Sequence, residues 1–388
     1  MNALQAAQQL VSITKGVPLQ VYPDQCVRAR NKHLACNRCA VVCPVNAIVV
    51  QENRVTVDSD ACVKCGACLH VCPAAAFSGY DGVDKLLGYV KSLPNAARLE
   101  LACPHRLDLS SATDPASALL VITRCLVSLS PSTYVELFNR GAQIVLLRLD
   151  ACAGCPLQRA CSTIEQTAER INQLYNDQPD RAVVIVKTRP AASESPAVPL
   201  HVNRPAISRR GLFSLLRPHL DDQDAAAPAS DACAPFMHER ARLLRAIAAS
   251  PDREAMHTES LFSSLKMTGV CSACEVCAVV CPTQALRIEK STADFSLTFD
   301  TGACTRCDLC VELCPERALA YGDPPSIECV NAGGTETLAA GSLTRCRRCG
   351  ATFADAKGMA LCPPCLFRRQ NPFGLTDMTH TLPVRGDQ

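Results

Sequence analysis

The sequence contains no tryptophan, and aromatic residues make up only 4% of its 388 residues. Cores rich in aromatic side chains are therefore excluded for most of the chain. The formal net charge is +2 and the basic residues are scattered, so the charge pattern gives no sign of a nucleic-acid partner. A chain of this length is expected to form about two to four domains.

Long apolar runs are also missing from the sequence. No stretch of about 18 apolar residues occurs, so no membrane-spanning helix is predicted. The N-terminal stretch MNALQAAQQLVSITKG has no apolar core after a basic start, so no signal peptide is predicted either. We therefore expect a cytoplasmic protein, in which thiols stay reduced.

Cysteine, by contrast, is abundant, with 27 copies. Three stretches share the pattern C-x2-C-x2-C-x3-C-P, namely CVKCGACLHVCP (62–73), CSACEVCAVVCP (271–282) and CTRCDLCVELCP (304–315). A fourth stretch, HLACNRCAVVCP (33–44), follows the same pattern but carries His33 at the first cysteine position. In a small secreted protein so many cysteines would indicate disulfides, but these spacings are typical of metal ligands.

The four stretches form two pairs, within residues 26–80 and 268–322. Between the two stretches of each pair, the chain begins with β-forming residues, turns through polar ones and returns as a short strand. This pattern predicts a β-hairpin between two cysteine-rich loops. Zinc knuckles are disfavoured as the explanation, because zinc uses two pairs of ligands with a longer spacer between them.

Each pair resembles the bacterial dicluster ferredoxin family. In that family four thiolates hold each [4Fe–4S] cluster, and the fourth cysteine of each run binds the cluster of the other run. The resemblance implies four clusters in this chain. Their ligands would be Cys36, Cys39 and Cys72 for the first, Cys43, Cys62, Cys65 and Cys68 for the second, Cys271, Cys274, Cys277 and Cys314 for the third, and Cys281, Cys304, Cys307 and Cys310 for the fourth.

The first of these clusters lacks one ligand in the motif, and Cys26 and His33 are both candidates for the place. If Cys26 takes it, the loop to the next ligand grows from two residues to nine, which costs on the order of 1 kcal/mol of closure entropy. A thiolate bond to iron outweighs that cost, and histidine is the rarer ligand. Cys26 is therefore favoured over His33. We also expect residues 26–32 to be extended, with three cations on one face that suit an acidic partner.

The region between the pairs, residues 95–189, alternates β-rich and helical patterns. Strands that alternate with helices indicate a parallel sheet, whose ligands lie beyond the carboxyl ends of the strands. Buried strands are predicted at residues 99–103, 119–125, 143–152 and 181–186.

Three of these strands end in cysteine, and a fourth cysteine follows the last of them by three residues. Four cysteines are therefore expected at one edge of the sheet: Cys103, Cys125, Cys152 and Cys155. Together they predict an additional iron–sulfur centre or a dithiol site, whose type is left open. Buried structural cysteines are the alternative, and Cys161 is a spare for any of the four. The stretches RCLVSLSP and DACAGCP resemble the delta subunit of methyl-viologen-reducing hydrogenase, which implies one iron–sulfur centre here. No role is assigned to Cys233 or Cys329.

The last cysteine group lies in RCRRCGATFADAKGMALCPPC (345–365), which resembles a zinc ribbon. Two C-x2-C knuckles, separated by twelve residues, would close around one tetrahedral ion. Gly350 allows the tight turn after the first knuckle. A rubredoxin-like iron site uses similar knuckles, but its intervening segment is normally longer, so zinc is favoured. The ligands would be Cys346, Cys349, Cys362 and Cys365.

The predicted fold is an α+β multidomain protein, with two ferredoxin-like dicluster modules flanking a small parallel α/β domain, plus a C-terminal zinc ribbon. The segment that joins the α/β domain to the second module is rich in Ala, Pro and Ser, which predicts a linker with one helix at 237–250. The predicted units are a first module at 1–94 with its core at 26–80, an α/β domain at 95–189, a linker at 190–267, a second module at 268–322, and a zinc-ribbon-like domain with a tail at 323–388.

No nucleotide-binding fingerprint and no acid–base or nucleophile constellation appears in the sequence. A chain with four clusters and a further centre can pass single electrons, so the predicted function is electron transfer between redox enzymes. By analogy with multi-cluster ferredoxins encoded beside molybdenum oxidoreductases, formate dehydrogenase or a relative is the suggested partner. Two alternatives are a redox enzyme subunit with disulfide or two-electron chemistry at the middle cysteines, and an assembly factor for a metalloenzyme.

Charges near the third cluster lead to one more expectation. Three of the four cysteine loops carry a cation just before the second cysteine, whereas this loop has Ala273 there and Glu275 immediately after Cys274. A carboxylate opposes the more negative reduced form of a cluster. The third cluster is therefore predicted to have the lowest reduction potential of the four.

Overall fold

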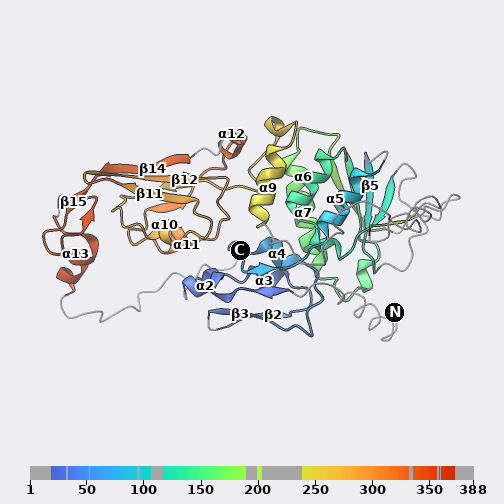
Figure 1. Ribbon diagram of the computed structural model, residues 1–388, viewed down its shortest axis with the longest axis horizontal. Coiled ribbons are helices and arrows are strands. Elements are labelled where there is room, and N and C mark those ends of the chain that lie inside the picture. The colour runs from blue at the N-terminus through green and yellow to red at the C-terminus, as the bar shows by residue number, and fades with distance from the viewer. Residues whose placement is uncertain are drawn as a thin grey trace, which may run out of the picture.

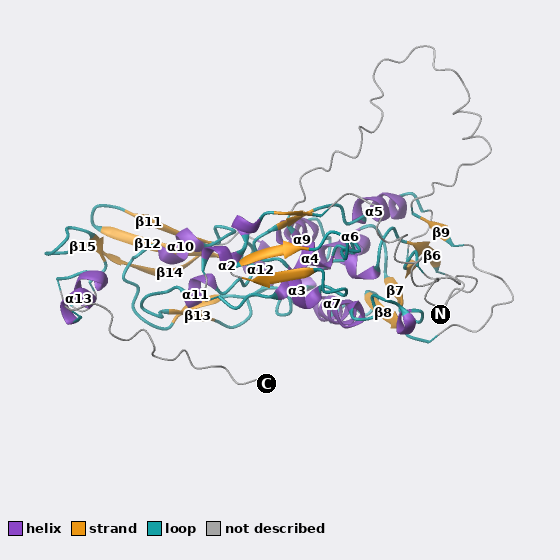
Figure 2. Ribbon diagram, turned by 90° about the horizontal axis from the view of Figure 1, so that it is seen from below, coloured by secondary structure: helices purple, strands orange, loops and turns teal. Residues whose placement is uncertain are grey.

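The computed structural model describes residues 19–31, 34–51, 53–93, 97–105, 117–188, 199–202, 238–331, 335–355, 358 and 360–371. Figure 1 shows an elongated arrangement, in which the C-terminal elements, the second cysteine-rich module, the first module and the α/β domain follow one another along the long axis. Figure 2 shows the same order from below. Within the described part of the chain, no helix has the length and apolar character needed to cross a membrane.

The first module is built around two short helices that carry cysteines. Strands β2 and β3 pair antiparallel, which confirms the predicted hairpin. Helices α3 and α4 each end at a cysteine followed by proline, because proline cannot continue a helix. The elements of this module are β1 (Gln20–Val21), η1 (Pro23–Gln25), α2 (Val27–Arg30), α3 (Arg38–Val42), β2 (Ile48–Gln51), β3 (Arg54–Val57), α4 (Ala67–Val71) and β4 (Phe77–Ser78).

The second module has the same plan with one extra strand. Strands β11 and β12 form the predicted hairpin, and alternate residues of β12, Phe295, Leu297 and Phe299, are buried. Strand β14 pairs with the other edge of β12, so this sheet continues beyond the predicted domain end at residue 322. The elements are β10 (Leu265–Met267), α10 (Val276–Val280), β11 (Leu286–Lys290), β12 (Asp294–Asp300), α11 (Leu309–Glu312), β13 (Leu319–Tyr321) and β14 (Thr335–Ser342).

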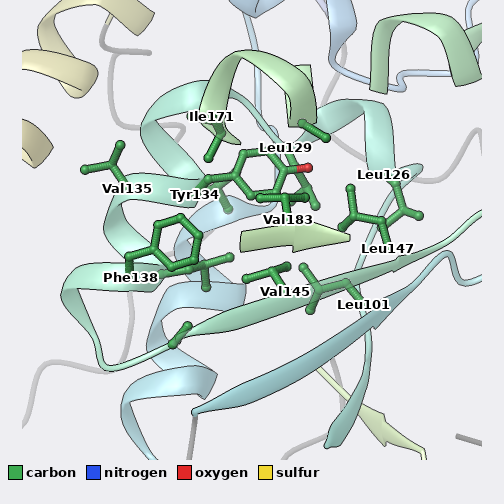
Figure 3. Close-up of a cluster of buried hydrophobic side chains, with 14 of the residues drawn as sticks. Leu101, Leu126, Leu129, Tyr134, Val135, Phe138, Val145, Leu147, Ile171 and Val183 are labelled. Atoms are coloured by element: carbon green, nitrogen blue, oxygen red, sulfur yellow. The ribbon is translucent and has the colours of Figure 1, made fainter. Parts of the chain in front are cut away.

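The middle domain contains the predicted parallel sheet. Its strands are all parallel and follow the order β8-β7-β5-β6-β9. Figure 3 shows Tyr134 and Phe138 of α6 packed over Val145 and Leu147 of β7. The elements are α5 (Val83–Lys91), β5 (Arg98–Ala102), β6 (Ala118–Val121), η2 (Leu126–Ser128), α6 (Pro131–Asn139), β7 (Ile144–Arg148), η3 (Cys152–Gly154), α7 (Ala160–Leu174), β8 (Ala182–Val186) and β9 (Leu200–His201).

Two segments outside the predicted α/β limits pack into this domain. Helix α5 lies before residue 95, yet Val83, Leu86 and Val90 of this helix are buried in the same core as the strands. Strand β9, inside the predicted linker, pairs with β6. The core therefore gathers side chains from both flanks, which the composition of those flanks does not reveal.

Helix α9 (Glu239–Ala248) is the helix that the sequence predicts inside the linker, but it packs as part of the core. Its residues Leu243, Ala246 and Ile247 are buried among the α/β side chains. The Glu239 carboxylate accepts hydrogen bonds from the backbone N–H of Ser132, at 2.8 Å, and from its hydroxyl, at 2.9 Å. The described residues from 238 to 267 therefore differ from the prediction of a linker. Two further short elements are η4 (Arg253–Ala255) and α12 (Ile327–Asn331).

The C-terminal elements form a small unit at one end of the molecule. Strands β15 (Thr344–Arg345) and β16 (Thr352–Phe353) pair antiparallel, and helix α13 (Pro363–Gln370) follows them. The backbone N–H of Ala354 donates to the carbonyl of Ser272 at 3.1 Å, so this unit touches the first cysteine loop of the second module.

Candidate metal centres

Four cysteines line each of four separate cavities in the two modules. Every cavity combines cysteines of one run with the proline-linked cysteine of the other run, and Cys26 lines the first cavity. We name them site A (Cys26, Cys36, Cys39 and Cys72), site B (Cys43, Cys62, Cys65 and Cys68), site C (Cys271, Cys274, Cys277 and Cys314) and site D (Cys281, Cys304, Cys307 and Cys310).

Left-handed backbone bends the three complete runs around their cavities. Non-glycine residues seldom adopt positive φ, and such strain persists only where the surroundings hold it, commonly at functional sites. In the incomplete run, the corresponding residue Arg38 is the first residue of helix α3 and does not have left-handed backbone. In the complete runs the residues on either side of the second cysteine have positive φ: Lys64 and Gly66, Ala273 and Glu275, Arg306 and Asp308.

Backbone N–H groups donate to the sulfur atoms of the proline-linked cysteines. At three of the four, Cys43, Cys72 and Cys314, the donor is the residue four positions further on, an alanine in the repeated C-P-x-x-A sequence. An N–H donor favours the thiolate form of its acceptor, and such hydrogen bonds tune iron–sulfur clusters. The N···S distances are 3.2 Å from Ala47 to Cys43, 3.2 Å from Ala76 to Cys72, and 3.3 Å from Ala318 to Cys314.

The spacing of the sulfur atoms separates two kinds of candidate centre. A tetrahedral ion with Zn–S bonds of about 2.3 Å holds its sulfurs roughly 3.8 Å apart. Among the described residues, one group of potential ligands has all its donor atoms within 4.8 Å of one another: Cys346, Cys349, Cys362 and Cys365. Sites A to D surround cavities instead, which fits a multi-iron cluster lying between the sulfurs.

Burial and mutual repulsion raise the pKa of several of these thiols. The pKa of Cys39 rises to about 12, first because of burial and then because of Cys72 and Cys36. The pKa of Cys277 also rises to about 12, through burial and the neighbouring Cys274. Metal binding requires thiolates, so loading these sites releases protons and depends on positive metal charge to offset the repulsion.

The structure brings Cys26 to site A, whereas His33 lies outside the described residues. Cys26 follows η1 and precedes α2, so it stands between two helical turns rather than on an extended strand. The expectation of an extended segment over residues 26–32 is therefore wrong for the four residues of α2, Val27–Arg30. Turning the chain helically shortens it, which lets a cysteine ten positions before Cys36 reach the same cavity.

Five cysteines gather beyond the carboxyl ends of the parallel strands, and we call them the five-thiol group: Cys103, Cys125, Cys152, Cys155 and Cys161. The neighbouring Cys103 thiol raises the pKa of Cys125, and burial followed by the neighbouring Cys161 thiol raises the pKa of Cys152. Cys161 thus joins the four cysteines that the strand ends predict, because η3 turns the chain back toward the start of α7.

Backbone donors also face the five-thiol group. The N–H of His105 donates to Cys103 Sγ at 3.5 Å, and the N–H of Leu157 donates to Cys155 Sγ at 3.4 Å. Both donors lie two residues after the cysteine, as they do at Cys304 in site D. The same local geometry therefore recurs at the sheet edge and in the ferredoxin-like loops.

A buried ion network lies below the five-thiol group. Arg148, at the end of β7, pairs with Glu100 of β5 and with Asp150, whose Oδ1 is 3.1 Å from the Arg148 Nε. The side chains of Arg148 and Glu100 are 0% exposed. Asp150 stands two residues before Cys152, so this network ties the strands to the loop that carries that thiol.

The C-terminal group is shaped as two knuckles. The Cys349 and Cys362 sulfurs are 3.6 Å apart, close to the separation expected around one tetrahedral ion. Gly350 has a φ of +75°, as the predicted turn requires, and its N–H donates to the carbonyl of Cys346. Apart from the cysteines, Phe353 and Leu361 are the hydrophobic residues of this small core.

We expect removal of the bound ion to unfold the C-terminal unit, because two apolar side chains cannot hold it together without a metal. Cys362→Ser should lose one equivalent of zinc and leave the iron content unchanged, as measured by metal analysis. Trypsin should then cut after Arg347 or Arg348 much faster than in the unchanged protein. Retention of zinc and of trypsin resistance would contradict a structural metal site here.

Charge around site C differs from what the sequence predicts. The Lys290 Nζ lies 2.6 Å from the Glu275 Oε1, so the carboxylate next to Cys274 is paired with a cation from β11. The sequence places these residues fifteen positions apart, and the hairpin brings them together. Glu275 alone therefore does not imply that site C has the lowest reduction potential of the four clusters.

The two charges can be tested separately. Glu275→Gln should raise the reduction potential of one centre, because it removes a negative charge and leaves Lys290 in place. Lys290→Gln should lower the potential of the same centre. Redox titration followed by electron paramagnetic resonance would measure both shifts, with Glu289→Gln, on the same strand, as the control. Shifts of the same sign in the two variants would contradict this electrostatic account.

Comparison with known proteins agrees with this geometry. The 4Fe-4S dicluster domain is matched twice, over residues 34–76 and 270–318. Two segments of the chain are thus similar to dicluster domains of the ferredoxin type. The 7Fe ferredoxin of Hydrogenibacillus schlegelii is 44% identical over 47 residues, which cover 12% of this chain and 60% of the relative. The match therefore spans less than two thirds of that relative. No solved structure matches the chain.

Proposed function

We propose that this protein relays single electrons between redox enzymes, with a [4Fe–4S] cluster in each of sites A to D. Such clusters, when bound, accept and release single electrons. The observation that carries the proposal is the arrangement of four thiols around every one of the four cavities, together with the match of both modules to dicluster domains.

The contacts between neighbouring sites support relay within each module. Burial is the main cause that raises the pKa of Cys68 in site B. The charges of nearby thiols raise it further, and one of these thiols is Cys39 of site A. The corresponding contact in the second module joins Cys310 of site D to Cys277 of site C. Ligand side chains of paired sites therefore lie close enough to interact electrostatically.

The five-thiol group is proposed to hold an additional iron–sulfur centre that exchanges electrons with site B. Cys65 of site B and both Cys125 and Cys155 pack against the same two apolar side chains, Val63 and Leu157. Burial raises the pKa of Cys65 to about 12, and the neighbouring Cys125 thiolate adds to that rise. The C-terminal unit is proposed to hold zinc rather than iron.

Metal analysis of anaerobically purified protein tests this assignment. Four [4Fe–4S] clusters require about sixteen iron and sixteen sulfide per chain, and iron in the five-thiol group adds to that number. Electron paramagnetic resonance after stepwise reduction should then reveal interacting reduced clusters. If the protein binds the expected iron but takes up no electrons at accessible potentials, the proposed relay function is wrong.

A molybdenum oxidoreductase such as formate dehydrogenase is the proposed electron donor or acceptor. This step rests on analogy with other multi-cluster ferredoxins and not on a contact of this chain. Anaerobic mixing with reduced formate dehydrogenase should reduce the clusters at a rate that depends on both protein concentrations. If reduced formate dehydrogenase does not reduce the clusters, it is not the partner, but the proposed relay is unaffected.

One observation favours a second candidate function. The Cys152 and Cys161 thiols lie close enough for their charges to interact, and both are partly exposed. Two such thiols could reduce a disulfide by forming one of their own, with two electrons then returned one at a time through the clusters. Turnover of a disulfide substrate by the unchanged protein, lost in Cys152→Ser, would favour this enzymatic function. If no turnover is seen, the electron relay is the only proposed function that stands.

A further inference from the structure

The two cysteine-rich modules meet at an apolar cluster that we call the junction. Its buried members are Val27, Leu34 and Leu309, of which Leu309 is 0% exposed. Cys36 of site A and Cys307 of site D both pack against it. The junction therefore places a cysteine of one module close to a cysteine of the other, although they are far apart in the sequence.

Arg38 holds the two sides of the junction together. Its guanidinium donates to the carbonyls of Thr305, at 3.5 Å, and Arg306, at 2.5 Å. It also lies 3.5 Å from the Asp308 carboxylate. These three residues surround Cys307, so one side chain of the first module binds the loop that presents a cysteine of site D.

Two more side chains connect the first module to its neighbours close to sites A and D. Arg30 of α2 donates to the carbonyl of Val280 at 3.3 Å, just before Cys281 of site D. The His238 ring, at the start of α9, lies 3.0 Å from the carbonyl of Cys72 in site A. In Figures 1 and 2, α2 lies at the end of the first module that faces α10 and α11.

Sites B and C have other neighbours. Site B packs against the five-thiol group through Val63 and Leu157. Ser272, beside Cys271 of site C, accepts a hydrogen bond from Ala354 of the C-terminal unit. Among the described residues, B therefore faces the α/β domain and C faces the C-terminal unit, on opposite sides of the A–D pair.

We infer that electrons cross between the two modules from site A to site D, and that Arg38 is the positioning residue that holds the Cys307 loop against Cys36. This inference rests on the proposed relay. It sets the order of the centres as five-thiol group, site B, site A, site D and site C. Redox partners then act at opposite ends of the molecule rather than at the same module.

Selective removal of clusters tests the order. Replacing Cys65, Cys68, Cys274 and Cys277 by serine leaves sites B and C with two thiols each and so removes their clusters. Replacing Cys36, Cys39, Cys307 and Cys310 does the same at sites A and D. Magnetic coupling between reduced clusters falls with the inverse cube of their separation. The first variant, with A and D left, should keep a split electron paramagnetic resonance signal. In the second, site C should give an unsplit signal, while site B couples only to the centre in the five-thiol group.

Both variants are checked for iron before the spectra are compared. A split signal from site C in the second variant, with no coupling between A and D in the first, would overturn the crossing, yet the relay would stand. Absence of iron–sulfur clusters from the unchanged protein would overturn the relay itself. The two failures are thus distinguishable.

Arg38→Gln provides a second test without removing a ligand. The fully reduced variant should keep its iron and the coupling within each module but lose the coupling between modules. Arg38→Lys should retain part of it, because a lysine can reach Asp308 but cannot donate to both carbonyls at once. Arg54→Gln, on the exposed β2–β3 hairpin, is the control. Unchanged spectra in Arg38→Gln would remove Arg38 from this role.

Discussion

Cys26→Ser should convert the cluster of site A into a three-iron centre, whereas His33→Ala should leave every cluster intact. Without Cys26, site A keeps three cysteines, and the iron that loses its thiolate becomes exchangeable. Iron should fall by about one per chain. The oxidised variant should then show a new electron paramagnetic resonance signal, because a three-iron cluster is paramagnetic in the oxidised state and a [4Fe–4S] cluster is not.

Cys329→Ser is the matched control, because Cys329 is an exposed cysteine that lines none of the four cavities. Its iron content and spectrum should equal those of the unchanged protein. The opposite pattern, with His33→Ala losing iron and Cys26→Ser harmless, would make histidine the ligand.

The cysteine runs could be predicted from the sequence because their geometry is local. Residues three positions apart share one loop, and the proline after the fourth cysteine ends the helix there. The paired hairpins and the parallel sheet followed from periodicity alone. Spacing thus carried most of the information on sites A to D and on the two knuckles.

What the sequence could not reveal depends on contacts between distant residues. Glu239 binds Ser132 across 107 positions, so α9 joins the α/β core instead of forming a linker. Strand β14 covers β12 although polar and small residues dominate it, since backbone pairing and not side-chain pattern holds an edge strand. The Lys290–Glu275 pair required knowledge of the hairpin register. The local signals of the ion network are the charged residues inside predicted buried strands, Glu100 within 99–103 and Arg148 within 143–152.

Arg148→Met should destabilise the α/β domain by about 3–5 kcal/mol, the usual cost of removing one partner from a buried ion pair. The substitution removes the Arg148 guanidinium from the buried Glu100 and Asp150 carboxylates. Glu100 also accepts a hydrogen bond from the Ser117 hydroxyl at 3.1 Å, and a neutral donor of this kind does not replace a cation. The midpoint of urea unfolding, followed by circular dichroism under anaerobic conditions, would measure the effect.

Arg140→Gln is the matched control, because Arg140 forms an ion pair with Glu136 at 2.9 Å on the surface of the same domain. Both side chains of that pair are 32% exposed, so its loss should cost only about 0.3–0.5 kcal/mol. Combining Arg148→Met with Glu100→Gln should recover part of the lost stability, since one of the two stranded charges is then removed. If Arg148→Met unfolds at the same urea concentration as Arg140→Gln, the buried network does not hold β5 and β7 together beneath the five-thiol group.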